Sequence, residues 1–243
     1  MGKYEFTDEI KVVNGIALHR IKAITDFGNV KAGELGGFIK KRANLSDEGN
    51  AWVSDNAEVC GDARVFGDAR VCGDARVFGD ARVCGDAWVC GDAWVFGDAR
   101  VYGDARVSDN AEVCGDARVY GDARVSDNAE VCGDARVCGD ARVFGDARVF
   151  GDAWVCGDAR VCDNAEVCGD ADYICIKGLG SEYRNTTFYN NKKGGVSVYC
   201  GCFYGTLDEF AAKVKETHAD NVYAQEYLAA VEVVKIHFGI KDD

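Results

Sequence analysis

Hydrophobic and polar positions alternate with a period of six residues through the middle of the chain. From Ala51 the sequence runs AWVSDN, AEVCGD, ARVFGD and continues without insertion to AEVCGD at Ala165, which makes twenty consecutive hexads. In each hexad a small Ala and a β-branched Val alternate with outward residues, and Gly-Asp or Asp-Asn follows as a turn. The pattern predicts one short strand per hexad, stacked on its neighbours, because a single hexad cannot bury its own apolar side.

The small-x-aliphatic spacing of these hexads resembles the hexapeptide-repeat family, whose chains wind three hexads per coil into a triangular left-handed prism. Periodicity by itself gives only parallel stacked strands. The resemblance implies a mainly β fold over residues 51–171, a left-handed parallel β-helix (hexapeptide-repeat solenoid) of about seven coils. At about 4.8 Å per coil, the prism would be roughly 30 Å tall.

A segment before the repeats predicts a β-rich N-terminal cap over residues 1–50. Asn14-Gly15 is a strong turn signal and predicts a short hairpin formed by Lys11 to Leu18 and His19 to Ile24. Residues 16 to 60 also resemble the start of YdcK-like hexapeptide proteins, a family that brings no established activity. The motifs that carry this resemblance are Arg20-Ile21-Lys22-Ala23, Asp26-Phe27, Val30-Lys31-Ala32-Gly33, Gly36-Gly37, Asn44-Leu45-Ser46 and Gly49-Asn50-Ala51-Trp52-Val53.

The repeat stops after Ala171, and residues 172–243 predict a small α+β module. YICIKGL, NTTFYNN and VSVYCGCFYG alternate like three antiparallel strands. Thr206 and Glu209 fit a capping box that opens a helix ending near His218, and a second amphipathic helix is expected from Val222 to Phe238. The text GSEYRNTTF and the following CGCF stretch resemble a terminal module on repeat proteins of phages and prophage-bearing Firmicutes. That resemblance implies a phage or prophage origin.

Stacking at intervals of 18 residues turns the outward positions into columns on three faces. The first face carries an arginine column beside aromatic residues, and its members are the candidate interaction face: Arg64, Arg82, Arg100, Arg118, Arg136, Phe66, Tyr102 and Tyr120. The second face carries Trp52, Arg70, Trp88, Arg106, Arg124, Arg142 and Arg160, and the third mixes Glu58, Arg76, Trp94, Glu112, Glu130, Arg148 and Glu166. Arginine beside aromatic rings is compatible with two interpretations: a structural cation–π arrangement neutralised by corner Asp residues, or a surface that binds a partner.

Composition narrows the classes of partner. The formal net charge of −13 and the pI near 4.7 argue against nucleic acid and anionic membranes. The N-terminus has no apolar signal region and no stretch of about 18 apolar residues occurs, so we expect a cytoplasmic protein, in the host cytoplasm if phage-encoded, with reduced thiols. Ten of the thirteen cysteines occupy one hexad position, where they replace Phe, Tyr or Ser as apolar side chains.

Catalytic chemistry finds little support in the sequence. Most well-known hexapeptide-repeat enzymes are acyltransferases with a His base in a cleft between subunits, and the zinc carbonic anhydrases related to them use three His. Residues 51–171 contain no His, and the chain has only His19, His218 and His237. Cys200-Gly201-Cys202 is compatible with a redox or metal pair, and packing is the favoured interpretation. We assign no catalytic residue, no metal and no cofactor.

The expected function is therefore a non-enzymatic β-helical scaffold or binding protein that forms a homo-oligomer. A trimer is favoured because hexapeptide-repeat proteins commonly form parallel trimers. One alternative is a phage protein that binds and antagonises a host protein or an anionic signalling nucleotide, and another is an acyltransferase. A polar surface in the C-terminal module is a second candidate for binding an anion: Arg184, Thr186, Thr187, Tyr189, Lys192 and Lys193.

Overall fold

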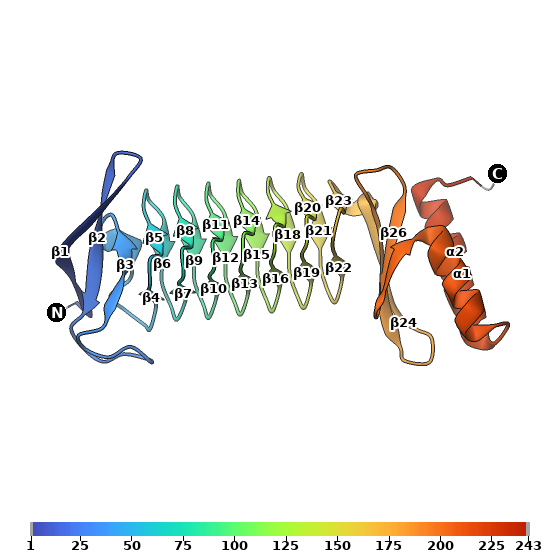
Figure 1. The fold of residues 1–243 in the computed structure, drawn as a ribbon, viewed down its shortest axis with the longest axis horizontal. Helices are drawn as coiled ribbons and strands as arrows, with labels where there is room; N and C mark the ends of the chain where they lie inside the picture. Colours follow the sequence, from blue (N-terminus) through green and yellow to red (C-terminus); the bar gives the residue numbers. More distant parts are fainter. Residues whose placement is uncertain (1, 242–243) are drawn as a thin grey trace.

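The computed structural model describes residues 2–241 and is an elongated molecule with three parts in a row (Figure 1). Strands of the N-terminal region lie at one end, a β-solenoid of about seven turns forms the middle, and a small α+β region lies at the other end. The predicted mainly β fold, with its solenoid and its two different ends, is confirmed. Within residues 2–241 no helix has the length and apolar character needed to cross a bilayer.

Each hexad contributes one strand of two residues, and these strands stack into three parallel sheets. The first face is the sheet of β6 (Arg64–Val65), β9 (Arg82–Val83), β12 (Arg100–Val101), β15 (Arg118–Val119), β18 (Arg136–Val137) and β21 (Trp154–Val155). The second face is the sheet of β4 (Trp52–Val53), β7 (Arg70–Val71), β10 (Trp88–Val89), β13 (Arg106–Val107), β16 (Arg124–Val125), β19 (Arg142–Val143) and β22 (Arg160–Val161). The third face contains β5 (Glu58–Val59), β8 (Arg76–Val77), β11 (Trp94–Val95), β14 (Glu112–Val113), β17 (Glu130–Val131), β20 (Arg148–Val149) and β23 (Glu166–Val167).

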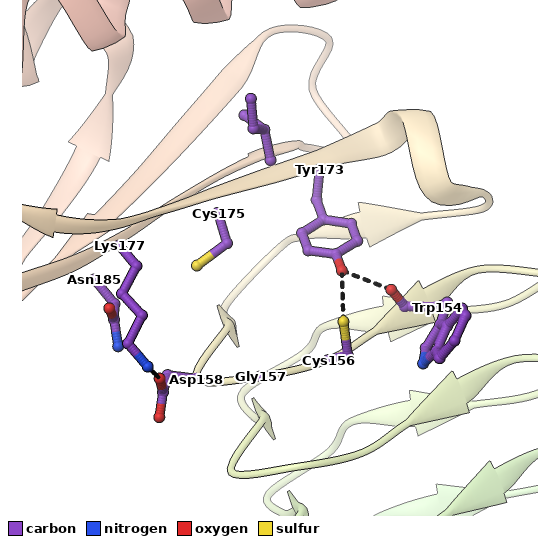
Figure 2. A pocket seen from close by; sticks show the side chains of 9 residues that line it. Trp154, Cys156, Gly157, Asp158, Tyr173, Cys175, Lys177 and Asn185 are labelled. Atoms are coloured by element: carbon purple, nitrogen blue, oxygen red, sulfur yellow. Dashed lines mark hydrogen bonds and ion pairs between the residues drawn. The ribbon is translucent and has the colours of Figure 1, made fainter.

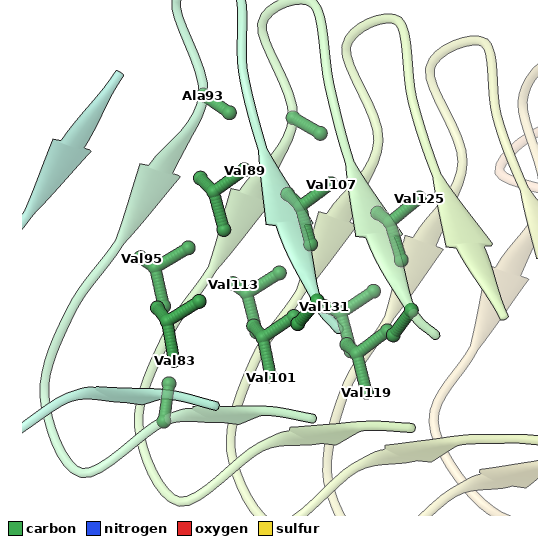
Figure 3. Close-up of a cluster of buried hydrophobic side chains, with 14 of the residues drawn as sticks. Val83, Val89, Ala93, Val95, Val101, Val107, Val113, Val119, Val125 and Val131 are labelled. Atoms are coloured by element: carbon green, nitrogen blue, oxygen red, sulfur yellow. The ribbon is translucent and has the colours of Figure 1, made fainter. Parts of the chain in front are cut away.

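The solenoid core consists of the Ala and Val of every hexad. Each of these residues, from Ala51 to Val167, is fully buried. Figure 3 shows valines of successive coils, such as Val83, Val101 and Val119, stacked directly along the solenoid axis. Burying one Val side chain contributes about 1.5–3 kcal/mol relative to leaving it in water, so the repeated columns dominate the stability of this region.

The corners turn through the left-handed backbone region, which explains the glycine in most hexads. Gly103 has φ 71°, and a Cβ built on it would lie 3.0 Å from the backbone nitrogen of Gly121 in the next coil. Asp109 and Asp127 occupy the same corner position with φ 60° and 59°. Aspartate tolerates this region better than most residues, so Asp-Asn can replace Gly-Asp without breaking the register.

The N-terminal region closes one end of the solenoid. Strands β1 (Tyr4–Val13) and β2 (Ile16–Ala23) form an antiparallel hairpin around Asn14-Gly15, and β3 (Leu35–Ile39) pairs in parallel with β5. A short 3-10 turn, η1 (Arg42–Asn44), follows. The turn of the expected hairpin is confirmed, but its strands are misplaced: the first begins at Tyr4, and Leu18 belongs to the second. Tyr4 is fully buried and its hydroxyl donates to the Leu45 carbonyl at 3.1 Å, which anchors the longer strand on the core.

The C-terminal region covers the other end. After η2 (Asp170–Asp172), a four-stranded antiparallel sheet contains β24 (Tyr173–Leu179), β25 (Arg184–Asn190), β26 (Val196–Cys200) and β27 (Phe203–Thr206). Helices α1 (Leu207–His218) and α2 (Val222–Phe238) pack on the outer face of this sheet (Figure 1). Both helices and the Thr206–Glu209 capping box are confirmed. The expected three strands are wrong, because Gly201 with φ 62° turns the chain and divides the last one in two.

Replacing Val101 by Ala tests the interior columns. We expect the free energy of unfolding to fall by about 2 kcal/mol, because two buried carbons are lost and a cavity remains. The neighbouring outward substitution Arg100→Ala is the control and should change stability by less than about 0.5 kcal/mol. Urea denaturation followed by circular dichroism measures both. Equal losses for the two variants would contradict this account of the core.

Candidate functional site

The five arginines of the first face form one continuous column, called here the arginine ladder (Arg64, Arg82, Arg100, Arg118 and Arg136). Each pairs directly with the next in parallel register, so their guanidinium groups follow one another at the rise of one coil, about 4.8 Å. Within residues 2–241 none of the five forms an ion pair. No corner aspartate therefore forms an ion pair with the ladder among the described residues, although Lys41 and, more weakly, Arg64 lower the pKa of Asp62.

Two aspartate ridges border the arginine ladder, one along each corner of the first face. One ridge consists of Asp62, Asp80, Asp98, Asp116, Asp134 and Asp152, and the other of Asp68, Asp86, Asp104, Asp122, Asp140 and Asp158. At the far corner of the second face four hexads carry Asp-Asn in place of Gly-Asp, so a carboxylate stays at each of these corners one position earlier: Asp55, Asp109, Asp127 and Asp163. The first face is thus a positive column between two negative ridges, all three with the same axial rise.

Aromatic side chains lie beside the arginine ladder. Tyr102 and Tyr120 stack with their ring centroids 5.0 Å apart, and Arg136 lies over the Trp154 ring at 5.8 Å. Phe66 and Trp154 are exposed by 38% and 44% of their surface. The structural cation–π interpretation therefore applies at one end of the ladder, and the remaining arginines lie open to solvent or half-buried.

The third face is different because it is partly covered and internally neutralised. Glu58 is almost fully buried and forms ion pairs with Lys11 at 2.7 Å and Arg76 at 3.6 Å. Lys11 belongs to the N-terminal hairpin, whose turn also closes a small cavity of about 160 Å³ over Phe78 and Trp94. Further along the same face, Glu130 pairs with Arg148 at 3.3 Å. Among the described residues Glu112 and Glu166 form no ion pair, so the unpaired charge of this face is negative and differs in sign from the ladder.

The expectation of reduced thiols is wrong for one pair, since a disulfide joins Cys114 and Cys132. The two residues lie 18 positions apart, at the same place in consecutive coils, and their Cα atoms are 4.5 Å apart, within the range of disulfides. Cys72 and Cys90 have the same spacing and are free thiols. A hydrogen bond from Cys90, supported by one from Trp88 Nε1 at 2.9 Å, lowers the pKa of Cys72 to about 7.

The six candidate residues of the C-terminal module do not form one surface. Thr186, Thr187 and Tyr189 are buried within β25, which lies across the end of the solenoid. The Thr187 hydroxyl accepts a hydrogen bond from the Arg160 backbone at 3.1 Å, and the Tyr189 hydroxyl contacts Cys162 Sγ at 3.0 Å. These side chains therefore attach the module to the solenoid.

Exposed members of that candidate set lie at opposite ends of β25. Arg184 begins the strand. Lys192 and Lys193 follow its end, and Lys192 Nζ donates to the Asp146 carbonyl at 3.0 Å. Six residues of strand separate Arg184 from Asn190, a distance of about 20 Å. Arg184 lines a polar cavity at the junction with the solenoid.

A cavity of about 500 Å³ opens where the first face meets the module (Figure 2). Tyr173 points across it, and its hydroxyl donates to the Trp154 carbonyl at 2.6 Å and lies 3.9 Å from Cys156 Sγ. Burial raises the pKa of Tyr173 and of the Cys175 thiol, so both stay protonated near neutral pH. The raised pKa of Cys175 is the opposite of what a cysteine nucleophile needs.

A second, more polar cavity of about 420 Å³ adjoins the first at Asp158 and Asn185. Arg142 and Arg160 of the second face reach it from the solenoid, and Arg184 reaches it from β25. Sequence reasoning placed these three residues in two separate sets. No local signal connects them, because their proximity depends on how the module docks on the last coil.

The remaining candidate groups are scattered. His19 lies in β2, His218 ends α1 beside Tyr227 with ring centroids 5.8 Å apart, and His237 Nε2 contacts the Ala171 carbonyl at 2.9 Å. Cys200 is buried in the module core, whereas Cys202 is exposed. No group of three metal-ligating side chains gathers within the described part of the chain.

Comparison with known families supports a YdcK-like β-helix for the solenoid. The hexads match the family model described as YdcK Beta solenoid repeat over residues 69–85, 75–91, 99–115, 111–127, 117–133, 135–149 and 141–157. All of these stretches lie within the twenty hexads. The comparison with curated proteins gave no match. The family description names a repeat architecture and no activity.

The disulfide predicts a measurable dependence on reductant. Cys114→Ser should lower the free energy of unfolding by about 3 kcal/mol, because the bond closes a loop of 18 residues. Reduction of the wild-type protein should give the same loss in urea denaturation. Cys84→Ser, at the equivalent position of another hexad, is the control. Its free energy of unfolding should stay close to that of the oxidised wild type and should still fall on reduction. A wild-type protein insensitive to reductant would contradict the pairing.

Proposed function

We propose that the protein is a non-enzymatic β-solenoid scaffold that assembles into a parallel homotrimer through its first face. One observation carries this proposal: the arginine ladder forms no ion pair with the described residues of its own chain, although two aspartate ridges of the same rise run beside it. An unpaired column of like charge is costly in isolation and favourable against a complementary column.

A parallel assembly matches these columns coil by coil. Rotation about an axis parallel to the solenoid keeps every coil of each copy at the same height. An aspartate ridge of one copy can then lie against the arginine ladder of the next, with one Arg–Asp pair per coil. A contact of this kind is heterologous and closes when the rotation is 120°, which gives a trimer. A two-fold contact through the middle of the face would place ladder against ladder.

The first face also offers the apolar area that a stable interface needs. Phe66, Trp154 and the stacked Tyr102 and Tyr120 would lose contact with water on association. Aromatic and arginine side chains are enriched in such interfaces. The third face is a weaker choice because the N-terminal hairpin covers its first coils, and on the second face Trp52 and Trp88 interrupt the arginine column.

A phage or prophage origin, with a place of action in the host cytoplasm, is part of this proposal and rests on the C-terminal resemblance alone. The scaffold would then present its C-terminal module three times at one end of the assembly. A partner such as a host protein would meet three identical copies of the module. Multivalent presentation of this kind raises the apparent affinity for a repeated target.

Light scattering on charge-reversed variants tests the assembly face. Wild-type protein should have about three times the chain mass of 26.2 kDa. Arg100→Glu/Arg118→Glu should reduce it to one chain, because two adjacent Arg–Asp pairs become repulsive. The matched control, Arg106→Glu/Arg124→Glu, makes the same charge change in the same coils on the second face and should remain trimeric.

Salt provides a second readout of the same contact. Salt screens the attraction between exposed Arg and Asp side chains, with a Debye length of about 10 Å at 0.1 M. The trimer should therefore weaken as the salt concentration rises. A monomeric wild type at low salt would reject the assembly proposal. Dissociation of both charge-reversed variants to the same extent would show that net charge, rather than the first face, controls the mass.

A further inference from the structure

The polar cavity at the end of the second face gathers three arginines from two different parts of the chain. Arg142 and Arg160 are direct partners in the parallel strands β19 and β22, so they follow one another at about 4.8 Å. Arg184 comes from β25 of the C-terminal module, and all three line one cavity of about 420 Å³. The cavity exists only because the module docks on the last coil.

The guanidinium groups share their cavity with two carboxylates, and Lys177 and Arg160 both help to lower the pKa of one of them, Asp158. None of the three forms an ion pair within residues 2–241. Two carboxylates also line the cavity, but Asp158 is already paired with Lys177 of β24. Three positive groups therefore face the single unpaired carboxylate of Asp140. Such a local excess of positive charge stands out in a chain of net charge −13.

One of the three arginines, Arg160, is held in place by a neighbouring tyrosine. Arg160 lies over the Tyr199 ring at 5.4 Å from the centroid. Arg184 is exposed and its guanidinium lies beside Gly201, so this side chain can adjust to a bound anion. A fixed guanidinium such as that of Arg160 loses little rotamer freedom when an anion binds, which favours binding at this position.

The geometry on either side of Arg184 indicates the size of the ligand. Arg184 also lines a neighbouring cavity of about 330 Å³, whose walls include Phe203, Phe210 and Tyr227. An anionic group on the arginines would thus lie next to an aromatic-walled space. Guanidinium groups bind phosphate oxygens through paired hydrogen bonds, and aromatic walls accept a flat ring by stacking.

We propose that this junction is a binding site for a phosphorylated ring compound of nucleotide size. The phosphates contact Arg142, Arg160 and Arg184, and the ring enters the cavity beside Phe203 and Tyr227. Tyr183 and Asn185, which also line the arginine cavity, supply further hydrogen-bond donors. The site does not depend on the oligomeric state, because all of its residues come from one chain.

Calorimetric titration with ADP and with inorganic pyrophosphate tests this site on the full-length protein. Wild type should bind both probes, ADP about tenfold more tightly because the ring adds stacking contacts. Arg142→Gln/Arg184→Gln should weaken both by about tenfold or more, since each substitution removes charge-assisted hydrogen bonds. Both side chains are exposed, so the variant should fold, as its thermal melt by circular dichroism will show.

The matched control is Arg70→Gln/Arg106→Gln, which removes two exposed arginines from the same face at a distance from the cavity. Its affinity for ADP should stay within about twofold of wild type, because the nearer residue is two coils, about one Debye length, away. Failure of wild type to bind either probe would overturn the proposal. Equal weakening in both double variants would overturn it as well, since binding would then be diffuse attraction. Equal affinity for ADP and pyrophosphate would overturn the assignment of the ring.

Discussion

The backbone hydrogen bond between consecutive coils is the interaction on which the rest of the structure depends. The Arg100 N–H donates to the Ala117 carbonyl at 2.9 Å and the Tyr102 N–H to the Val119 carbonyl at 3.0 Å, and the same pattern repeats along the solenoid. Because no insertion interrupts the hexads, each residue lies directly against the residue 18 positions later. The register therefore fixes which side chains are neighbours. Outward side chains at one hexad position form a column along the solenoid axis.

This constraint has opposite effects inside and outside the solenoid. Inside, identical Val and Ala side chains stack in columns and are fully buried in every coil. Outside, identical residues bring like charges together. The third face relieves this repulsion by alternating Glu58 with Arg76 and Glu130 with Arg148. The arginine ladder of the first face is not relieved within the described chain, which is the physical reason to assign it to a partner.

Much of this arrangement could be predicted from the sequence, because a period of six fixes the strands, the core and the columns together. The C-terminal helices were equally predictable, since Thr206 and Glu209 mark a helix start by local chemistry. The division of the last predicted strand was missed because Gly201 lies within an alternating apolar run. The burial of Tyr4 was not predicted, because this residue packs on the core only at the open end of the solenoid.

The candidate sites also differ in whether the sequence could predict them. The columns on the faces follow from the six-residue spacing alone. The arginine cavity instead depends on contacts between the solenoid and the C-terminal module, which has no repeat. Thr187 and Tyr189 look like surface polar residues in the sequence, yet their bonds to Arg160 and Cys162 fix the module on the last coil. That docking carries Arg184 to the end of the second face, beside Arg160. Three of the cavities described above lie where the repeat ends and a different fold begins, because only there do side chains of two different architectures meet.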